Sequence, residues 1–421
     1  MKFQSPKGMH DIFEDELVYF RKIKKACSRF ADFYRYQEIR TPILEQAELF
    51  EKGTGQTTDI VEKEMYSLRT KGGDHLALRP ELTPSIVRAY IEHGLQAMPK
   101  PIKLWYFGPV FRHEKPQAGR YRQFHQFGFE SLGVADSVVD ASIVLLTFNI
   151  LKELGFKHLV IEVNSIGDKQ CRPYFKKSLV SYLRSKSSSL CADCRRRLKQ
   201  NPLRALDCKE EKCQRIKKSA PQIIDHLCKE CHNHFKFFLE FLDELDFPYI
   251  LNAHLVRGLD YYTKTVFEIY EDTKEGREQG ALAGGGRYDD LVKLLGGKDT
   301  PGCGVACGVE RLVNLMRRGK KEKEAPPTAV FLAQVGDLAK RKGLVLLDNF
   351  RKSKVPVGEA IHKDSLTSQL KSADRAGAKY VLILGQKEAL EDKVIIREMK
   401  TGKQKIVGLK RVISEVKRKA R

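Results

Sequence analysis

The segment 107–130, FGPVFRHEKPQAGRYRQFHQFGFE, carries more recognition chemistry than a structural hairpin requires. Its two ends have the alternating apolar residues of β-strands, and its middle contains the proline and glycine of a connecting loop. A surface hairpin exposes polar side chains on one face only, because successive residues of a strand point to opposite faces. Polar residues occur here at both parities, which predicts that some of them point into a binding site.

The even-numbered residues of the second strand would share one face. They are Arg120, Arg122, Phe124, Gln126, Gly128 and Glu130, and Arg112 ends the first strand. Guanidinium groups pair with phosphate oxygens and a phenylalanine ring stacks on a base, so this face predicts binding of a polyphosphate nucleotide and a small polar substrate. The odd-numbered Phe127 and Phe129 are expected to pack on the other face. The pattern alone also fits an amphipathic hairpin whose polar face is solvated.

The composition is that of a soluble globular chain with an uneven excess of positive charge. The 421 residues suffice for two or three domains. The net charge is +22, and the segment from Pro327 to Arg421 contains 22 Lys and Arg against 10 Asp and Glu. Concentrated positive charge attracts phosphate backbones, which favours a nucleic-acid partner. No apolar run is long enough to span a membrane, and MKFQSPKGMHDIFEDE lacks the apolar segment of a secretory signal, so we expect a cytoplasmic protein.

The chain divides into parts of different composition. Residues 1–325 are predicted to form one domain of strands and helices, interrupted at 168–245 by a helical insertion rich in Lys, Arg, Ser and Cys. In the first part of this domain, Thr83 is expected to cap a helix that begins with a proline. The charged, Pro-containing segment 319–328 is predicted to be a linker. Residues 327–421 alternate strand and helix patterns, which indicates a βαβ-type domain with KTGKQ turning a final hairpin and the tail KRVISEVKRKAR solvated.

No phosphate-binding loop of a common type is present. The sequence has no Walker A pattern and no GxGxxG motif after a strand. The stretch AGGGRYDD has contiguous glycines followed by an arginine, unlike a dinucleotide-binding loop. A bound nucleotide is therefore expected to lie on strands.

Ten cysteines are present, six of them between Cys191 and Cys231 in the predicted insertion. In a large chain without a secretory signal, these are expected to be thiols or metal ligands rather than disulfides. Two CxxC pairs, Cys191 with Cys194 and Cys228 with Cys231, offer the four thiolates of a tetrahedral zinc site, and two nearby histidines add candidates. The gap between the pairs is longer than in common zinc ribbons. The pattern therefore favours free thiols that pack a small helical core, with structural zinc as the alternative.

Several segments together resemble the motifs of one enzyme family. FRHEKPQAGRYRQFHQFGFE is similar to motif 2 of the class II aminoacyl-tRNA synthetases, in the form used by histidyl-tRNA synthetases. GVERL resembles motif 3, and EIRTPILEQAELF, which contains Pro42, resembles motif 1. LVRGLDYYTKTVFEIY resembles a stretch peculiar to the histidyl enzymes, and RPELT and TDIVEKEMY fit the same family. The resemblance covers essentially the whole chain, and the combination is highly specific.

This resemblance implies a fold and an activity. It implies an α+β catalytic domain, built on an antiparallel sheet flanked by helices and carrying the helical insertion, followed by an α/β anticodon-binding domain. The implied activity is ATP-dependent ligation of L-histidine to the histidine tRNA through a histidyl-adenylate, with Mg²⁺ bridging the ATP phosphates near Glu130. The resemblance also implies a homodimer with an interface around Pro42. The C-terminal domain would hold the anticodon stem, and the insertion would hold the acceptor arm.

The resemblance assigns roles to individual residues. Arg112 and Arg257 would act on the α-phosphate during catalysis. The implied ATP-binding residues are Arg112, Arg120, Phe124 and Arg311, with Phe124 and Arg311 on either side of the adenine. The implied histidine-binding residues are Glu81, Thr83, Arg112, Gln126, Glu130, Arg257, Tyr261 and Tyr262. No metal-binding residue is assigned in this site.

Two other functions remain as alternatives. The first is a non-catalytic regulatory paralogue of the family, which acts in histidine biosynthesis. Such relatives typically lack the C-terminal domain and lose site residues, whereas both are present in this sequence. The second is another class II synthetase with the same type of C-terminal domain, such as the prolyl or threonyl enzyme. The stretch LVRGLDYY argues against it.

Overall fold

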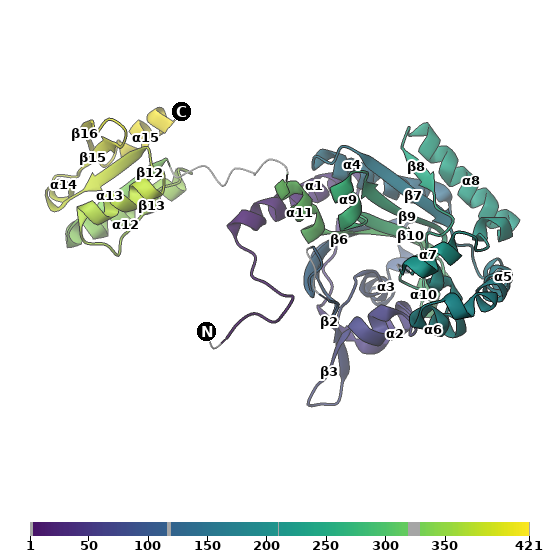
Figure 1. Cartoon of the computed structure of the whole chain (residues 1–421). Coiled ribbons are helices and arrows are strands. Elements are labelled where there is room, and N and C mark those ends of the chain that lie inside the picture. The colour runs from purple at the N-terminus through teal and green to yellow at the C-terminus, as the bar shows by residue number, and fades with distance from the viewer. Residues whose placement is uncertain (1–2, 116–118, 209, 319–328, 421) are drawn as a thin grey trace. The chain divides into compact units, whose positions relative to one another are not determined.

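The protein is represented by a computed structural model that describes residues 3–115, 119–208, 210–318 and 329–420. The chain forms two compact units, Met1–Glu322 and Lys323–Arg421. The predicted linker, 319–328, lies outside the described residues. Figure 1 shows a mixed sheet-and-helix unit that contains the N-terminus and a smaller unit that contains the C-terminus. Among the described residues, no helix combines the length and apolar character needed to cross a bilayer.

An eight-stranded sheet is the frame of the first unit, with the strand order β1-β5-β6-β11-β10-β9-β7-β8. In that order the strands are Gln37–Glu38, Ile102–Phe111, Gln123–Leu132, Gly302–Gly308, Ala283–Arg287, Thr263–Glu271, Leu159–Ser165 and Tyr249–Leu251. The six central strands are antiparallel, and only β1 and β8 run parallel to their neighbours. This confirms the predicted antiparallel sheet and the predicted hairpin of β5 and β6.

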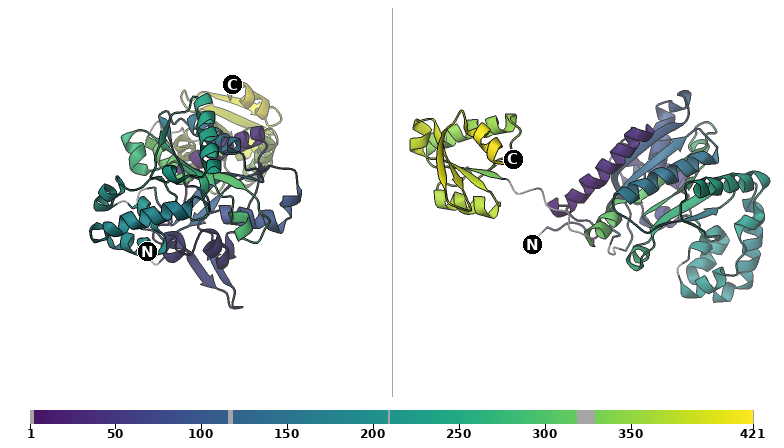
Figure 2. Two further views of the ribbon diagram at one scale, coloured as in Figure 1. Left: turned by 90° about the vertical axis from the view of Figure 1, so that its right-hand side faces the viewer. Right: turned by 90° about the horizontal axis from the view of Figure 1, so that it is seen from above.

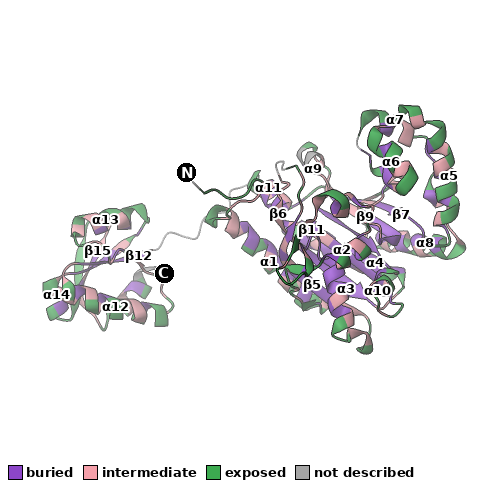
Figure 3. Ribbon diagram, turned by 90° about the horizontal axis from the view of Figure 1, so that it is seen from below, coloured by how far each residue is buried: buried purple, intermediate pink, exposed green. Residues whose placement is uncertain are grey.

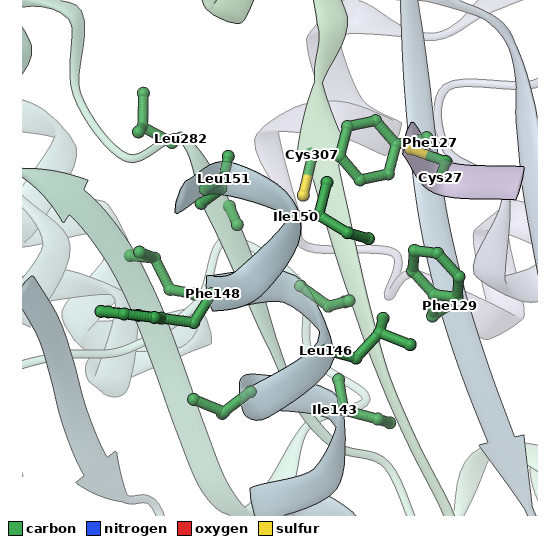
Figure 4. Close-up of a cluster of buried hydrophobic side chains, with 14 of the residues drawn as sticks. Cys27, Phe127, Phe129, Ile143, Leu146, Phe148, Ile150, Leu151, Leu282 and Cys307 are labelled. Atoms are coloured by element: carbon green, nitrogen blue, oxygen red, sulfur yellow. The ribbon is translucent and has the colours of Figure 1, made fainter. Parts of the chain in front are cut away.

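One face of this sheet is covered by α1 (Glu14–Tyr34), α4 (Ser137–Glu153) and α11 (Val309–Arg318). The right-hand view of Figure 2 shows α1 and α4 side by side over the strands. Phe127 and Phe129 of β6 are fully buried under these helices, in the cluster drawn in Figure 4. The odd-numbered row of the strand therefore faces the core, as predicted.

The opposite face of the sheet carries α3 (Thr83–Glu92). Leu82, which precedes the helix, and Ile86, in its first turn, pack against β5. Next to α3 lie a three-stranded sheet and short helices: β2 Leu44–Gln46, α2 Ala47–Gly53, η1 Ile60–Glu64, β3 Tyr66–Arg69, β4 His75–Leu78, η2 Leu95–Ala97 and α10 Leu291–Leu294. The short helix α9 Lys274–Gln279 contacts β9. The prediction that Thr83 caps the helix was wrong. Thr83 is already within α3, where its hydroxyl donates to the carboxylate of Glu130 at 2.8 Å and accepts no capping hydrogen bond from the N–H groups of the first turn.

The chain between β7 and β8 is helical. Its elements are α5 Arg172–Ser185, η3 Ser187–Ser189, α6 Ala192–Gln200, η4 Pro202–Asp207, α7 Glu211–Lys217, η5 Ile223–His226 and α8 Lys229–Glu244. The sequence patterns indicated α5 and the η5–α8 segment but not α6 or α7. The two CxxC pairs do not meet each other: each lies with a different partner pair, which excludes the zinc knuckle considered from the sequence. One of the histidines considered as a ligand, His234, instead contacts Asp140 of α4 at 2.6 Å.

The second unit is built on a five-stranded sheet of order β13-β12-β14-β15-β16. Its elements are β12 Val330–Gln334, α12 Asp337–Lys352, β13 Gly358–Glu359, α13 Leu366–Arg375, β14 Tyr380–Leu384, α14 Gln386–Leu390, β15 Lys393–Glu398, β16 Gln404–Gly408 and α15 Val412–Ala420. The predicted final hairpin is present as β15 and β16. The tail is not simply solvated, because Val412 and Val416 of α15 are buried in the core.

Candidate active site

A cavity of about 390 Å³ lies over the face of the eight-stranded sheet that α3 also covers. All the predicted site residues except Glu130 line it: Glu81, Thr83, Arg112, Arg120, Phe124, Gln126, Arg257, Tyr261, Tyr262 and Arg311. Glu130 is 1% exposed and lies behind the lining residues Thr83 and Tyr288, to which it is hydrogen-bonded. Segments far apart in the sequence therefore converge on one site.

Five arginines line this cavity, and we refer to four of them, Arg112, Arg120, Arg257 and Arg311, as the arginine side. Arg112 follows β5, and its Nε donates to the carbonyl of Pro80 at 2.9 Å. Its guanidinium carbon lies 5.6 Å from the ring centroid of Phe124, the second residue of β6. That bond to Pro80 fixes the orientation of the guanidinium group while leaving its other N–H groups available for a ligand.

Arg311 lies in the first turn of α11, which follows β11, and donates to the carbonyl of Ala281. Burial, together with the neighbouring charges of Arg120 and Arg112, lowers its pKa to about 10. Arg120 has one acidic contact, Glu114, at 3.5 Å. Like charges held this close repel one another, so the arginine side stabilises an anionic ligand more strongly than separate arginines would.

Arg257 is held by an ion pair with Glu268 of β9, and its guanidinium carbon lies 5.9 Å from the ring centroid of Tyr262. Gly284 of β10 makes room for it, because a Cβ atom at this position would lie 2.3 Å from Arg257 Nη2. The glycine in this strand therefore allows a side chain to approach the backbone closely and is not part of a phosphate-binding loop.

The opposite part of the cavity contains two buried glutamates with their hydroxyl donors, and we call it the carboxylate side. Glu130 accepts hydrogen bonds from Thr83 at 2.8 Å and from Tyr288 at 2.6 Å. Burial raises its pKa to about 8. Gly304 on the neighbouring strand leaves space for this carboxylate, since a Cβ atom there would lie 1.6 Å from Glu130 Oε2. A glutamate that binds a proton near neutral pH is suited to a ligand with its own titratable group.

Glu81 is the second buried glutamate and is 4% exposed. Its carboxylate accepts from Thr54 at 2.5 Å and from Tyr261 at 2.8 Å. Burial raises its pKa, and these two hydrogen bonds oppose the shift. Hydroxyl donors thus hold both glutamates in place without neutralising them by an arginine or lysine contact.

Three buried polar atoms of lining residues have no hydrogen-bond partner within the described part of the chain. They are the hydroxyl of Tyr106, Oε1 of Gln126 and Nε of Arg257. An unpaired buried polar atom is costly, so such groups usually have a bound partner. A polar ligand in the cavity would supply partners for these atoms.

A family model described as Histidyl-tRNA synthetase matches residues 8–312, which is more than half of the chain. The chain belongs to the histidyl-tRNA synthetase family. A second model, described as Anticodon binding domain, matches residues 330–419. Both matches agree with the resemblance found in the sequence motifs.

Named relatives of this histidyl-tRNA synthetase family member align over the full chain. The histidine–tRNA ligase of Thermodesulfovibrio yellowstonii is 43% identical over 419 residues, covering 100% of this chain and 99% of that protein. The histidine–tRNA ligase of Desulfitobacterium hafniense strain DSM 10664 / DCB-2 is 44% identical over 405 residues, covering 96% and 95%. The crystal structure of apo S. aureus histidyl-tRNA synthetase superposes with a TM-score of 0.80 at 34% identity, covering 98% of this chain and 99% of that chain.

One predicted member of the polar row lies elsewhere in this synthetase fold. Arg122 does not line the cavity; its guanidinium group donates to the carbonyls of Glu114 at 3.2 Å and Lys7 at 3.4 Å. Strand β6 begins only at Gln123, so the two-residue alternation that relates the later positions does not extend back to Arg122. The even-numbered row holds from Phe124 to Glu130.

Several site residues of the synthetase were missed from the sequence. Tyr106 lies across from Gly128 on the neighbouring strand, and a Cβ atom at 128 would lie 2.2 Å from its hydroxyl. A glycine within a strand often marks such a close approach, so Gly128 was an available signal. Thr54, the hydroxyl donor to Glu81, gave no local signal, because its partner is distant in sequence.

The stretch 283–289, which the family resemblance implies would close the pocket, does so only in part. Ala283, Gly284 and Tyr288 line the cavity. Arg287 points to the other face of the sheet, where it is fully buried and pairs with Asp140 at 2.8 Å.

Proposed function

We propose that this protein is a histidine–tRNA ligase that uses ATP to join L-histidine to its cognate tRNA through a histidyl-adenylate. The observation that carries the proposal is one cavity with four arginines on one side and two buried glutamates with hydroxyl donors on the other. The arginine side suits a polyphosphate, and the carboxylate side suits a small ligand with N–H groups. A regulatory, non-catalytic relative would have no use for the complete arginine side.

On the arginine side, the ATP phosphates would meet Arg112 and Arg120. Arg112 would bind the α-phosphate and Arg120 the γ-phosphate. The adenine would stack between Phe124 and Arg311, because a guanidinium plane and an aromatic ring both stack on a base. Burial and the charges of Arg120 and Arg112 lower the pKa of Arg311, and phosphates bound at Arg112 and Arg120 would relieve the part that comes from repulsion.

On the carboxylate side, Glu81 and Thr83 would hold the α-amino group of histidine, and Glu130 with Tyr262 would bind the imidazole ring. Gln126 and Tyr261 complete this part of the pocket. The unpaired Oε1 of Gln126 supports a ligand that donates a hydrogen bond at this point. A pocket that pairs both imidazole nitrogens would exclude amino acids that leave its buried polar groups unpaired, by several orders of magnitude.

The first reaction step needs no protein nucleophile. A carboxylate oxygen of histidine attacks the α-phosphorus, a new O–P bond forms, and the P–O bond to pyrophosphate breaks. Negative charge increases on the α-phosphate oxygens in the transition state, where Arg112 and Arg257 would stabilise it. In the second step a terminal ribose hydroxyl of the tRNA attacks the carbonyl carbon, its proton is lost, and AMP leaves.

Mg²⁺ would enter as part of the ATP substrate, bound to its phosphates. The earlier expectation that Glu130 lies near this ion does not suit the geometry. Both Glu130 oxygens accept hydroxyl hydrogen bonds, and its raised pKa favours the neutral acid. A neutral, hydrogen-bonded carboxyl group is a poor ligand for a hard cation, so Glu130 belongs with the amino acid.

The remaining parts of the chain would serve the tRNA and the assembly. The basic C-terminal unit, assigned here to residues 327–421, would hold the anticodon stem, and the insertion at 168–245 would hold the acceptor arm. A homodimer would form around Pro42, where Ile43 and Leu44 are exposed apolar side chains. The protein would act in the cytoplasm, together with its tRNA. Light scattering of the purified protein measures the dimer directly.

ATP–pyrophosphate exchange with each amino acid in turn tests the proposed function. We expect exchange with histidine alone. Exchange with proline or threonine would assign the chain to another class II enzyme, and no exchange with any amino acid would support the regulatory alternative. Transfer of labelled histidine to tRNA then tests the second step separately.

A further inference from the structure

We propose that the insertion binds a structural zinc ion through Cys191, Cys194, Cys208 and Cys213. The four Sγ atoms lie within 4.8 Å of one another. All four cysteines are free thiols, three of them buried and Cys191 half-buried. Four thiolates converging on one point are the usual donor set of a structural zinc site, because zinc prefers tetrahedral sulfur ligands and has no redox chemistry of its own.

The geometry of the cluster suits one ion. A tetrahedral site with Zn–S bonds of about 2.3 Å places its sulfurs ~3.8 Å apart. The distance from Cys191 Sγ to Cys208 Sγ is 3.8 Å. The spacing along the chain also agrees, since two residues separate Cys191 from Cys194 and four separate Cys208 from Cys213. A metal cluster with several iron atoms would spread its sulfurs further apart than these four are.

Backbone groups around the cysteines are oriented for thiolates. The N–H of Cys194 points to the sulfur of Cys191, and the N–H of Cys191 points to the sulfur of Cys213, both at 3.3 Å. Such N–H···S hydrogen bonds stabilise negative charge on metal-bound sulfur and fix the ligands in place. The basic helices α6 and α7 supply further positive charge around a site whose four thiolates exceed the charge of one zinc ion.

The helices α6 and α7 contribute few buried side chains of their own. In α6 and in α7, whose residues are all described, the single buried residue is a cysteine: Cys194 and Cys213. Figure 3 shows α5, α6 and α7 with largely exposed outer surfaces. The cysteines lie in a cluster whose buried apolar residues come mainly from other segments, such as Phe175 of α5 and Leu206 of η4. A metal ion would fix α6 and α7 to that cluster.

The site would also position residues at the active-site cavity. The η4 segment, which leads directly into Cys208, donates through Arg204 to the carbonyl of Thr57 at 2.7 Å. Arg197 of α6 pairs with Asp59 at 2.7 Å. Arg204, Asp207 and Asp59 all line the cavity. A zinc ion that fixes α6 and η4 therefore fixes one wall of that cavity.

A second site of the same kind is carried by a separate set of contacts, at Asp168, Cys171, Cys228 and Cys231. Their ligand atoms also lie within 4.8 Å of one another, and the N–H of Cys228 points to the sulfur of Cys171 at 3.0 Å. Three thiolates and one carboxylate oxygen make a tetrahedral zinc donor set. Cys171 precedes α5 and Cys228 precedes α8, so this ion would join the first and last helices of the insertion.

Metal analysis of the purified full-length chain tests both sites without any substitution. We expect inductively coupled plasma mass spectrometry to find two zinc ions per chain. Zinc-free protein in which all ten thiols react with a thiol reagent would overturn the proposal. Iron in place of zinc would overturn the choice of metal. A single zinc ion per chain would support one of the two sites, namely the one at which a cysteine substitution removes that ion, and would overturn the other.

Single substitutions assign each ion to its ligands. We expect Cys208→Ser to hold one zinc and Cys171→Ser to hold one. Cys27→Ala is the matched control, because Cys27 is a buried cysteine in the α1 core, outside both clusters, and this variant should keep two. Equal zinc content in Cys208→Ser and in the control would overturn the four-thiolate site. If a variant is insoluble, the unaltered protein can be loaded with cobalt in place of zinc. We expect the visible absorption of cobalt with tetrahedral thiolate ligands, and the absence of this absorption would contradict the proposal.

Limited proteolysis separates a structural ion from an adventitious one. Trypsin should cut the Lys- and Arg-rich segment 195–218 at least tenfold faster after zinc is removed with a chelator. Added zinc should restore the slow rate, and added magnesium should not. An unchanged cleavage rate after complete zinc removal would contradict the structural role.

Discussion

The two sides of the active-site cavity hold charged groups in opposite ways. On the carboxylate side, Glu81 and Glu130 each accept two hydroxyl hydrogen bonds and are almost completely buried. On the arginine side, Arg112 and Arg311 are anchored through backbone carbonyls, and the positive charges of the cluster repel one another. The carboxylate side is organised before a ligand binds, whereas the arginine side is electrostatically incomplete without an anion.

This difference corresponds to two tasks. Selection of an amino acid requires a rigid pocket whose polar groups reject a wrong ligand by remaining unpaired. Phosphoryl chemistry requires positive charge where negative charge develops, and that charge is most effective when no protein anion neutralises it. Arg257 is the intermediate case, since it pairs with Glu268 while lining the cavity. The following four substitution and pH experiments test how far the two sides are independent.

Arg257→Ala should give the largest effect. We expect the rate of adenylate formation to fall roughly 1,000-fold, because one donor to the developing charge is worth about 3–4 kcal/mol in a site of this kind. The KM for histidine should change much less. Arg277→Ala is the control, because Arg277 pairs with Glu162 at 2.6 Å outside the cavity. Equal losses in the rate and in histidine binding, measured by pyrophosphate exchange, would remove the transition-state role.

Glu130→Gln should affect the other side selectively. The amide has the shape of the carboxyl group but cannot become anionic, so we expect the KM for histidine to rise about 100-fold. The KM for ATP should remain within threefold and serves as the internal control. An equal rise in both constants would mean that the two sides are coupled, contrary to the comparison above.

The free energy of unfolding should depend on pH differently in the unaltered protein and in Glu130→Gln. The pKa of Glu130 is raised from 4.5 to about 8 by burial, so the folded protein binds a proton that the unfolded chain releases between these pH values. Stability of the unaltered protein should therefore fall as pH rises through this window. Between pH 6 and pH 8 the loss should be about 2 kcal/mol relative to Glu130→Gln. Parallel urea denaturation curves for both proteins would contradict a buried, proton-binding glutamate.

The smallest predicted difference compares two neighbouring arginines. Arg120 lines the cavity, whereas Arg122 is bound to backbone carbonyls away from it. We expect Arg120→Ala to raise the KM for ATP about tenfold, which corresponds to about 1.4 kcal/mol, and Arg122→Ala to change it less than threefold. Similar effects of both substitutions would mean that the arginine side extends further along the loop than its lining residues indicate.

Local patterns predicted the frame of the protein well. Alternation along β6 separated Phe127 and Phe129, which are buried in the core, from Gln126 and Glu130, which face the site. The pattern failed where regular structure ends. Arg122 precedes the first residue of β6, and the tail helix α15 buries only two valines, which is too weak a signal in a strongly basic segment.

The cysteines show a second limit of sequence patterns. The sequence favoured free thiols, and the only metal site considered from it paired the two CxxC motifs with each other, because their spacings are the same. The fold instead joins Cys191 and Cys194 with Cys208 and Cys213, and Cys228 and Cys231 with Asp168 and Cys171. Which pairs meet depends on how α5, α6 and α7 turn, and short polar helices give little indication of their direction.

The sequence by itself indicated the family, the polar row of β6 and ten of the residues that line the cavity, because motifs and strand alternation are local properties. Only the tertiary structure decided that Tyr106 and Thr54 belong to the site, that Glu130 is buried enough to bind a proton near neutral pH, and that the cysteines form two separate clusters. Burial and the meeting of distant segments depend on all the elements packed around a point, and no single stretch of sequence contains that information.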